Sequence, residues 1–353
     1  MKKNKICLIF STRPEIIKLA PIAKILKKNK KNFFFVNTGQ HFDFNMSQIF
    51  YNQFKLQKPK YKFNKNKNCS NIFFISKCMN FIEKILIKEN PTHVIIQGDT
   101  DTTLIGALTA YLFNRNLKKN KKIKIIHVEA GLRSFDESMP EEINRKIVDI
   151  VSDILLVPTF FEKKNLLKEN LHKTKKIKIT GNTIAESIDI IGKNIHKSKN
   201  IKKFFLLTIH RAETVDNKRK FLELIKNLNE ISKKFKINVV FPIHPRTKKN
   251  LSKQLIDSLK NISFIKPLGY LDFIRLLNSC KIVLTDSGGI QEEAYILNKP
   301  CITLRNNTER QVTTFNKSNI ITGCDKARIV KAINFIIKKK IKIRIKKFLV
   351  TDM

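Results

Sequence analysis

Acidic side chains gather in one short segment of a strongly basic chain. The sequence has 70 Lys+Arg and 29 Asp+Glu, yet five acids lie in HVEAGLRSFDESMPEEINRK, residues 127–146. Glu129 ends an apolar run, and Glu141 follows Pro140 at the head of a helical pattern. A further carboxylate, Asp99, ends the apolar run VIIQGD. Because carboxylates beyond neighbouring strands can share one site, they predict general acid and base chemistry.

Two histidines follow apolar runs in the same way. His210 ends LLTIH, and His244 lies in FPIHPR. An isolated histidine is often a packed or surface residue, and an acid at a strand end often caps the next helix. Several strand-end groups that can exchange protons are harder to explain in this way. They favour a catalytic site over a purely structural role.

The segment KIVLTDSGGIQEEA predicts a seat for phosphate. Its apolar run ends at Asp286, and Ser287, Gly288 and Gly289 open a helix. The unpaired backbone N–H groups of such a helix start carry the positive end of the helix dipole. Ser287 could instead serve only as an N-cap. Arg310 in LRNNTERQ could bind the same anion, because a guanidinium matches two phosphate oxygens at once.

A second cationic segment, STRPEIIKLAPI, lies near the start of the chain. Arg13 precedes Pro14, which marks a helix start, and Lys18 follows on the early turns. Arg13 is the stronger candidate ligand in so lysine-rich a chain. Phosphate anchors together with carboxylates suit a nucleotide sugar, whose diphosphate needs cations and whose sugar needs acids and bases.

The motifs indicate no cofactor. The HExxH spacing of a zinc site is absent from the sequence, and no metal is expected. The GxGxxG fingerprint of dinucleotide binding is absent as well, which argues against a nicotinamide-dependent route.

The elements that would hold these residues alternate along the whole chain. Helical patterns at 14–28, 71–88 and 100–113 separate short apolar runs, and strands apolar on both faces predict parallel sheets covered by helices. Ligands bind beyond the carboxyl ends of such strands. The runs form two series: KICLIFS, FFFVNTG, HVIIQGD, KIIHVEAG, ILLVPT and IKITGN, then FFLLTIH, NVVFPIH, ISFIKP, KIVLTDSGG and PCITLR.

Two series in a chain of 353 residues predict two doubly wound domains. We expect an N-terminal Rossmann-like domain at 1–190 with the catalytic carboxylates, and a C-terminal one at 191–340 that binds the nucleotide. A short tail follows at 341–353.

The net charge of +41 would ordinarily suggest a nucleic-acid partner. Lysines are spread over helix faces and loops rather than interleaved with aromatics, and Lys, Asn, Ile and Phe are abundant together, so we interpret the charge as compositional and expect no nucleic acid. The six cysteines contain no CxxC pair, which favours a reducing compartment. No apolar run reaches the ~18 residues of a membrane span. We expect a cytoplasmic protein with no membrane partner.

Nine motifs follow one another in a fixed order: STRPEIIKLAPI, NTGQHFDFNMSQ, QGDTDTTLIGA, HVEAGLRSFDESMPEEINR, ITGN, TIHRAE, FPIHPR, LTDSGGIQEEA and TERQ. In this order and spacing, across residues 5–325, they resemble the non-hydrolysing UDP-N-acetylglucosamine 2-epimerases. The resemblance implies a glycosyltransferase-B-like α/β fold with the active site in the interdomain cleft, a homodimer, and a UDP-sugar substrate.

The resemblance also implies a reaction and roles. UDP-N-acetylglucosamine and UDP-N-acetylmannosamine would interconvert through elimination of UDP, a 2-acetamidoglucal, and re-addition with C2 protonated from the other face. The product would feed surface polysaccharide synthesis. Asp99, Glu129 and Glu141 correspond to the carboxylates that handle the C2 proton and orient the sugar. His210 corresponds to the group that supports the departing diphosphate.

The resemblance also implies which residues contact the nucleotide and which could bind an activator. Glu293 matches a ligand of the ribose hydroxyls, and Phe273 would lie beside the uracil. Most of the others match phosphate ligands: Arg13, Lys18, Ser287, Gly288, Gly289 and Arg310. Some bacterial relatives bind a second UDP-N-acetylglucosamine as an activator, and Gln40, His41 and His244 match parts of that allosteric site. Asp136 and Glu137 are expected on a surface loop.

The sequence departs from the family in the loop after Arg310, where relatives often have Pro in place of Gln311, and in its tail, which ends IRIKKFLVTDM. The tail could be a shortened form of the last helix of relatives. Three alternatives stay open. They are a hydrolysing epimerase, an epimerase of another UDP-2-acetamido sugar and, more remotely, a glycosyltransferase of the same fold.

Overall fold

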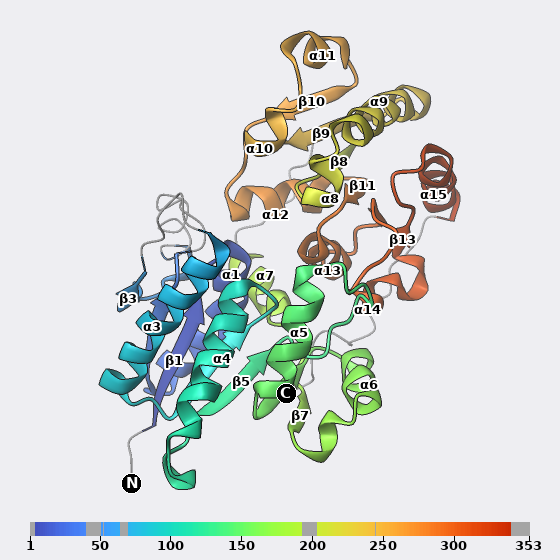
Figure 1. The fold of residues 1–353 in the computed structure, drawn as a ribbon. Coiled ribbons are helices and arrows are strands. Elements are labelled where there is room, and N and C mark those ends of the chain that lie inside the picture. The colour runs from blue at the N-terminus through green and yellow to red at the C-terminus, as the bar shows by residue number, and fades with distance from the viewer. Residues whose placement is uncertain are drawn as a thin grey trace. The chain divides into compact units, whose positions relative to one another are not determined.

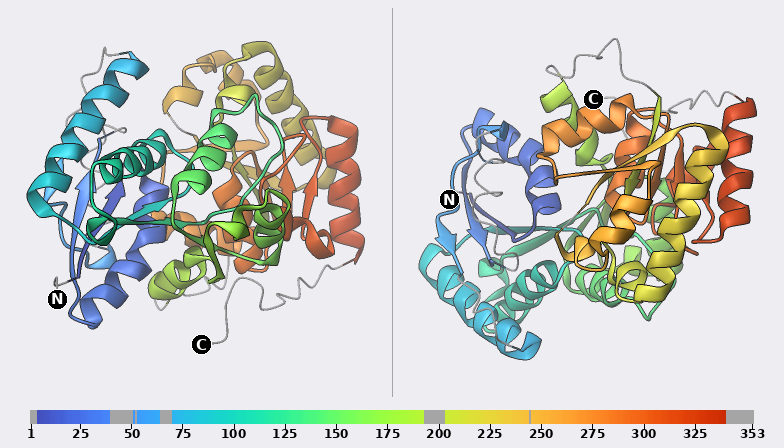
Figure 2. Two further views of the ribbon diagram at one scale, coloured as in Figure 1. Left: turned by 60° about the horizontal axis from the view of Figure 1, so that its bottom comes forward. Right: turned by 90° about the horizontal axis from the view of Figure 1, so that it is seen from above.

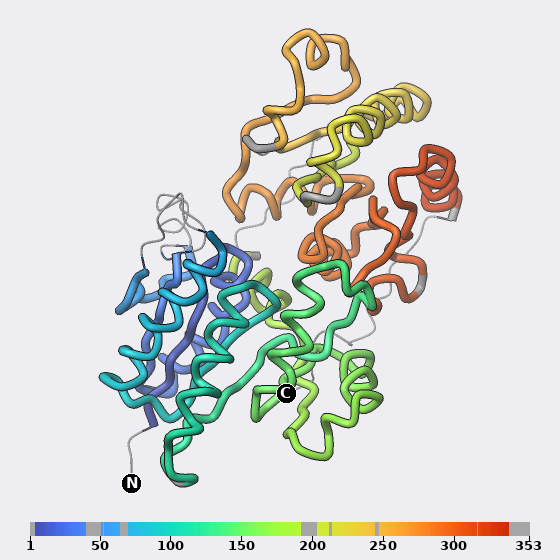
Figure 3. The backbone as a smooth tube through the Cα atoms, viewed as in Figure 1, coloured from blue at the N-terminus to red at the C-terminus, as the bar shows by residue number. Residues whose placement is uncertain are grey.

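The computed structural model describes residues 4–39, 51, 53–63, 70–192, 203–243 and 245–339. The described residues up to Ile190 form one compact unit, and those from Ile191 onward form a second. Each unit contains a parallel sheet, and helices connect most of the successive strands in the described residues. Figure 3 traces the path of the backbone.

The first unit is built on a seven-stranded parallel sheet in the order β3-β2-β1-β4-β5-β6-β7 (Figure 1). The order reverses between β1 and β4, which is the switch point where doubly wound sheets bind ligands. The strands are β1 (Lys5–Phe10), β2 (Asn32–Asn37), β3 (Tyr61–Lys62), β4 (His93–Gln97), β5 (Lys124–Val128), β6 (Ile154–Val157) and β7 (Lys176–Ile179).

Helices cover this sheet. One face buries apolar residues of α3, α4 and α5 against strands β1, β2, β4 and β5, and these helices lie side by side (Figures 1 and 2). The helices are α1 (Arg13–Lys28), α3 (Asn71–Glu89), α4 (Asp101–Arg115), α5 (Pro140–Val151), α6 (Phe160–Lys168) and α7 (Thr183–Gly192), with short 3-10 turns η1 (Lys119–Lys121) and η2 (Leu171–Lys173).

The second unit has a six-stranded parallel sheet in the order β10-β9-β8-β11-β12-β13, and its switch point lies between β8 and β11. Its strands are β8 (Phe204–Thr208), β9 (Asn238–Pro242), β10 (Ile262–Ile265), β11 (Ile282–Thr285), β12 (Cys301–Thr303) and β13 (Asn319–Ile321). Its helices are α8 (Ala212–Val215), α9 (Lys218–Phe235), α10 (Pro245–Lys248), α11 (Lys253–Ser258), α12 (Tyr270–Ser279), α13 (Gly288–Ile296), α14 (Gln311–Thr314) and α15 (Lys326–Lys339), with the turn η3 (Phe315–Lys317).

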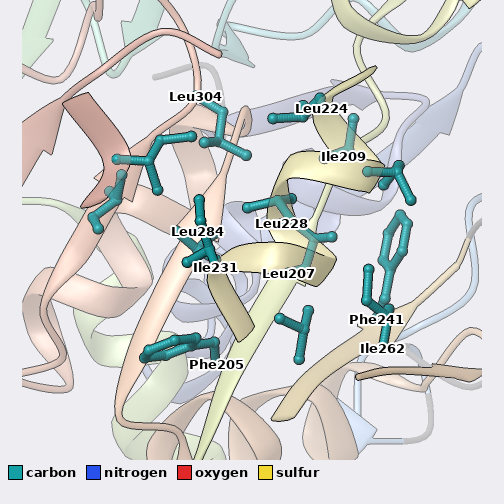
Figure 4. Close-up of a cluster of buried hydrophobic side chains, with 14 of the residues drawn as sticks. Phe205, Leu207, Ile209, Leu224, Leu228, Ile231, Phe241, Ile262, Leu284 and Leu304 are labelled. Carbon is teal, nitrogen blue, oxygen red and sulfur yellow. The ribbon is translucent and has the colours of Figure 1, made fainter. Parts of the chain in front are cut away.

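The core of the second unit lies between its sheet and helices α9 and α15. Leu224, Leu228 and Ile231 of α9 pack on Leu207 and Phe241 of the strands, and Figure 4 shows these side chains meeting in one cluster. The apolar residues of α9 recur every three or four positions, so one helix face is buried against the sheet.

The predicted fold class is confirmed: both units are doubly wound α/β domains. The expected helices 14–28, 71–88 and 100–113 appear as α1, α3 and α4. Strands β3 and β13, of two and three residues, were not predicted. Within the described ranges, every helix is too short or too polar to cross a bilayer.

Candidate active site

The loop after β1 is fixed by a buried glutamate at the third position of α1. Glu15 accepts hydrogen bonds from the backbone N–H groups of Ser11 at 2.9 Å and Thr12 at 2.6 Å. The same carboxylate accepts from the Thr100 hydroxyl at 2.7 Å, beyond β4. Glu15 therefore ties together the two loops of the switch point, and Arg13 begins α1 at that position.

Glu129 is a buried carboxylate held by two donors. Both of its oxygens accept from Lys18 Nζ, at 2.7 and 2.6 Å, and the Gln97 amide donates to Oε2. Its own backbone has φ of +69°, a left-handed conformation uncommon for residues other than glycine. Lys18 comes from α1 and Gln97 from the end of β4, so the fold brings three elements to this carboxylate.

Asp99 follows β4 and is oriented by an arginine of α5. Its Oδ2 accepts from Arg145 Nε at 2.9 Å and from Nη2 at 2.5 Å. Arg145 also donates through Nη1 to Glu142 at 2.6 Å. The Asp99 side chain remains about a quarter exposed, at 24%. The carboxylate is thus fixed in direction while solvent or a ligand can still reach it.

The adjacent residues Glu141 and Glu142 have different environments. Glu142 is fully buried, and it accepts the backbone N–H and the hydroxyl of Ser134, each at 2.9 Å. Glu141 is partly exposed, and within the described residues its carboxylate makes no hydrogen bond or ion pair. Glu142 therefore orders the preceding loop, whereas Glu141 remains accessible to solvent or a ligand.

Sequence reasoning placed Glu142 beside Glu141 with Arg145 one turn on, but it gave Glu142 no role, and it did not single out Gln97. Both glutamates have the spacing of a helical pair with Arg145, and the structure shows that Glu142 makes the contact. Gln97 precedes a glycine at a strand end and gives no comparable signal.

A buried cluster of charged and polar side chains lies next to the loop that carries Asp99. His127 contacts Asp149 through Nδ1 at 2.7 Å and the Gly98 carbonyl through Nε2 at 2.9 Å. Arg133 Nη2 lies 2.8 Å from the same aspartate. Burial alone would raise the pKa of the Asp149 carboxyl, but the hydrogen bond to His127 and the charges of His127 and Arg133 outweigh it and lower the pKa. The cluster fixes the backbone just before Asp99.

In the second unit, His210 follows β8 and Asp286 follows β11. Asp286 is fully buried and accepts the backbone N–H groups of His210 at 3.1 Å and Arg211 at 3.0 Å. Its Oδ1 lies 3.4 Å from Nδ1 of His210, whose side chain is 51% exposed. The imidazole therefore faces a carboxylate on one side and is open on the other.

Helix α13 begins at Gly288, as predicted, with Ser287 as its N-cap. The Ser287 side chain makes no capping hydrogen bond, so capping does not account for its hydroxyl. A Cβ at Gly288 would lie 2.2 Å from Glu309 Oε1, whereas one at Gly289 would meet only Ser287 Oγ, at 4.0 Å. A side chain at Gly288 would therefore require the Glu309 carboxylate to move.

Three arginines surround this helix start. Arg310 Nε lies 3.4 Å from Glu292, while Arg305 and Arg211 contact Glu309 at 3.0 and 3.4 Å. Three guanidinium groups thus contact two carboxylates. Guanidinium groups and a helix N-terminus both favour an anion as ligand, and here they lie together.

The other predicted ligands lie on the same unit. Glu293 is buried on α13, and Phe273 is partly exposed on α12. Gln40, His41 and His244 lie outside the described residues.

Among the described side chains, no cluster of His, Cys, Asp and Glu could hold a metal ion. Asp99 and Asp101 have the DxD spacing of some metal sites, but they contact Arg145 and Asn144 instead.

Comparison with known proteins gives a consistent result. The family model described as UDP-N-acetylglucosamine 2-epimerase matches residues 24–348. Relatives with that name in Methanocaldococcus jannaschii and Methanococcus maripaludis are 43% and 44% identical, over 95% of this chain and 93% and 92% of theirs. The crystal structure of the M. jannaschii epimerase in complex with UDP-GlcNAc and UDP is similar, with a TM-score of 0.83 and 41% identity over 97% of this chain and 94% of that one.

Proposed function

Because the chain belongs to the UDP-N-acetylglucosamine 2-epimerase family, we propose that it interconverts UDP-N-acetylglucosamine and UDP-N-acetylmannosamine without hydrolysis. The similar M. jannaschii structure with UDP-GlcNAc and UDP bound supports a UDP-sugar substrate. We further propose that the product supplies surface polysaccharide synthesis.

The observation that carries this proposal is the environment of Glu129. Its carboxylate is buried, and it contacts the ammonium group of Lys18 through both oxygens. A carboxylate of this kind can take up a proton and later return it, and the neighbouring amine stabilises the negative charge of the carboxylate. Asp99, fixed by Arg145, and the accessible Glu141 are further carboxylates on the same sheet edge, which suits protonation of C2 from either face.

In the proposed reaction one carboxylate removes the proton from C2 of the sugar. The C2–H electrons form the C1=C2 double bond as the C1–O bond breaks, and UDP leaves with the electron pair of that bond. The product of this step is 2-acetamidoglucal. In the reverse step UDP oxygen adds to C1 while C2 takes a proton on the opposite face. No electron acceptor is needed, because the two steps are redox-neutral.

Departure of UDP must supply much of the driving force, because a C2 proton beside an acetal carbon is weakly acidic. Preorganised donors lower such a barrier by stabilising the charge that develops on the leaving group. The N-terminus of α13 and Arg310 carry the required positive charge, and His210 presents an exposed imidazole. We assign the developing diphosphate charge to these groups.

Further contacts to the nucleotide follow the same assignment. Arg13, Lys18, Ser287 and Gly289 would contact phosphate, Glu293 the ribose hydroxyls and Phe273 the uracil. Lys18 would keep its contact to Glu129 as it does so, which would couple the proton site to the diphosphate.

The test is turnover of UDP-N-acetylglucosamine in deuterated water, followed by proton NMR at C2 without metal or nicotinamide. We expect UDP-N-acetylmannosamine with deuterium at C2. Free N-acetylmannosamine together with UDP would contradict the proposal in favour of the hydrolysing reaction. Conversion of only a different UDP-2-acetamido sugar, such as a uronate, would contradict the substrate assignment while keeping the chemistry.

A further inference from the structure

Asp286 is a fully buried carboxylate. In the loops at the switch point, it contacts the turn that follows β8. The backbone N–H of His210 donates to both carboxylate oxygens, to Oδ2 at 3.1 Å and to Oδ1 at 3.3 Å. The backbone N–H of Arg211 donates to Oδ2 at 3.0 Å. The third contact is to the His210 ring, whose Nδ1 lies 3.4 Å from Oδ1. Backbone and side chain of His210 thus face the same carboxylate.

The carboxylate itself is rigidly held. The neighbouring strand ends are joined by the hydroxyls of Thr208 and Thr285 at 2.6 Å and by the backbone N–H of Asp286, which donates to the Thr208 carbonyl at 3.3 Å. Because β8 and β11 pair in parallel, both strands deliver their following residues to one edge. Asp286 can therefore fix the direction in which the histidine points.

We propose that Asp286 is the positioning residue for His210, an inference that rests on the proposed function. Its carboxylate holds a proton at Nδ1 and so turns Nε2 outward, where a departing diphosphate would meet it. The tautomer and direction of an imidazole are set by what its second nitrogen contacts. The 51% exposure of the His210 side chain leaves Nε2 accessible to such a ligand.

The informative change is Asp286→Asn, which keeps the size of the side chain. One carboxylate oxygen becomes an amide nitrogen, which cannot accept from the turn or from a protonated Nδ1. Removal of an orienting carboxylate behind a histidine costs about 10² to 10⁴ in turnover in comparable sites. We expect kcat to fall at least about 100-fold while KM changes less than about threefold.

The test is a double-mutant cycle with wild type, Asp286→Asn, His210→Ala and the double variant. If Asp286 acts through His210, Asp286→Asn should change kcat less than about threefold once the imidazole is gone. A merely structural role would instead lower kcat by the same factor in both backgrounds. That result, or an unchanged kcat in Asp286→Asn alone, would overturn the proposal.

Asp153→Asn is the matched control, because Asp153 also accepts a backbone N–H, that of Ile125 at 2.9 Å, where β5 and β6 begin. We expect it to leave kcat and KM near the wild-type values. If Asp286→Asn does not fold, ¹⁵N NMR of histidine-labelled wild type decides the matter, with His210→Ala assigning the signal. An Nδ1 without a proton would refute the role of Asp286. Absence of epimerisation by wild type would refute the proposed function alone, because the Nδ1 signal is measured independently of turnover.

Discussion

The two units share one topology, but the carboxylate that connects the two loops at the switch point comes from a different side of that point in each unit. In the first unit Glu15, on the helix after the first strand, reaches across to the loop after β4. In the second unit Asp286, after β11, reaches back to the turn after β8. Each carboxylate connects the two loops at its own switch point, and the connection is made from a different side in each unit.

The units also differ in the ion pairs that their charged side chains form near the switch points. In the first, carboxylates and cations are paired, as in Glu129 with Lys18 and Asp99 with Arg145. In the second, three arginines contact two carboxylates beside the start of α13. This difference fits the roles that we propose, which are proton transfer at Glu129 and anion binding at the start of α13.

The largest effect is expected from Glu129→Gln, which removes the paired carboxylate of the first unit. We predict a loss of about 10³ in kcat, within the usual range for a general base, measured by steady-state turnover. The change also leaves Lys18 buried without its partner, and breaking a buried pair costs about 3–5 kcal/mol.

Stability and catalysis are separated by the double variant Lys18→Met with Glu129→Gln, in which both charges are gone. It should recover much of the lost thermal stability and none of the activity. A folded Glu129→Gln protein that keeps more than a tenth of wild-type kcat would contradict the assignment.

A smaller effect, and one confined to binding, is expected from Gly288→Ala. The added Cβ would lie 2.2 Å from Glu309 Oε1, so the helix start or the arginine cluster must shift. Overpacking costs about 1–3 kcal/mol, and if this cost falls on the nucleotide seat, KM should rise roughly 5- to 150-fold. Gly269→Ala is the control, since no atom lies within 4 Å of its Cβ position. Equal KM values in the two variants would argue against a nucleotide seat at α13.

A third prediction concerns how the stability of the protein depends on pH, and it rests on a carboxylate remote from the candidate active site. Glu89, at the end of α3, accepts from Lys5, Lys60 and Tyr61. Burial opposes its charge, but these hydrogen bonds outweigh it and lower the pKa of Glu89 from 4.5 to about 2. A depressed folded-state pKa stabilises the protein above pH 4.5, and this stability is lost as the pH falls toward 2.

Thermal unfolding of wild type and Glu89→Gln between pH 6 and pH 3 checks this contribution. Wild type should be the more stable at pH 6, and the difference should shrink on acidification. A difference that is constant or grows toward pH 3 would be inconsistent with the lowered pKa.

The smallest effect is expected from Glu137→Gln. Glu137 lies in the same acidic segment as Glu129, but it is exposed and pairs with Lys146 at 2.6 Å. Exposed pairs contribute little because solvent screens them. Turnover and melting temperature should both stay at wild-type values. A clear loss of activity would show that the loop acids take part in the chemistry after all.

Much of this arrangement could be predicted from the sequence, because the residues after each apolar run must lie at the carboxyl edge of a parallel sheet. That reasoning brought Asp99 and Glu129 together, and β4 and β5 do pair. It could not predict the contact of Lys18 with Glu129, which depends on how α1 packs. Nor could it separate Glu141 from Glu142, since which helix face is buried is decided by tertiary structure. The contact of Asp286 with His210 requires β8 and β11 to be neighbours, which local patterns do not encode.

The separate roles proposed for Glu129 and for the start of α13 are tested most directly by calorimetric titration of UDP into wild type, Glu129→Gln and Gly288→Ala. UDP should bind Glu129→Gln no more weakly than wild type, because the change leaves Arg13, Lys18 and the start of α13 in place to hold the phosphates. It should bind Gly288→Ala at least about fivefold more weakly. Equal weakening in both variants, or weakening in Glu129→Gln alone, would contradict the assignment of proton transfer to Glu129 and of diphosphate binding to the start of α13.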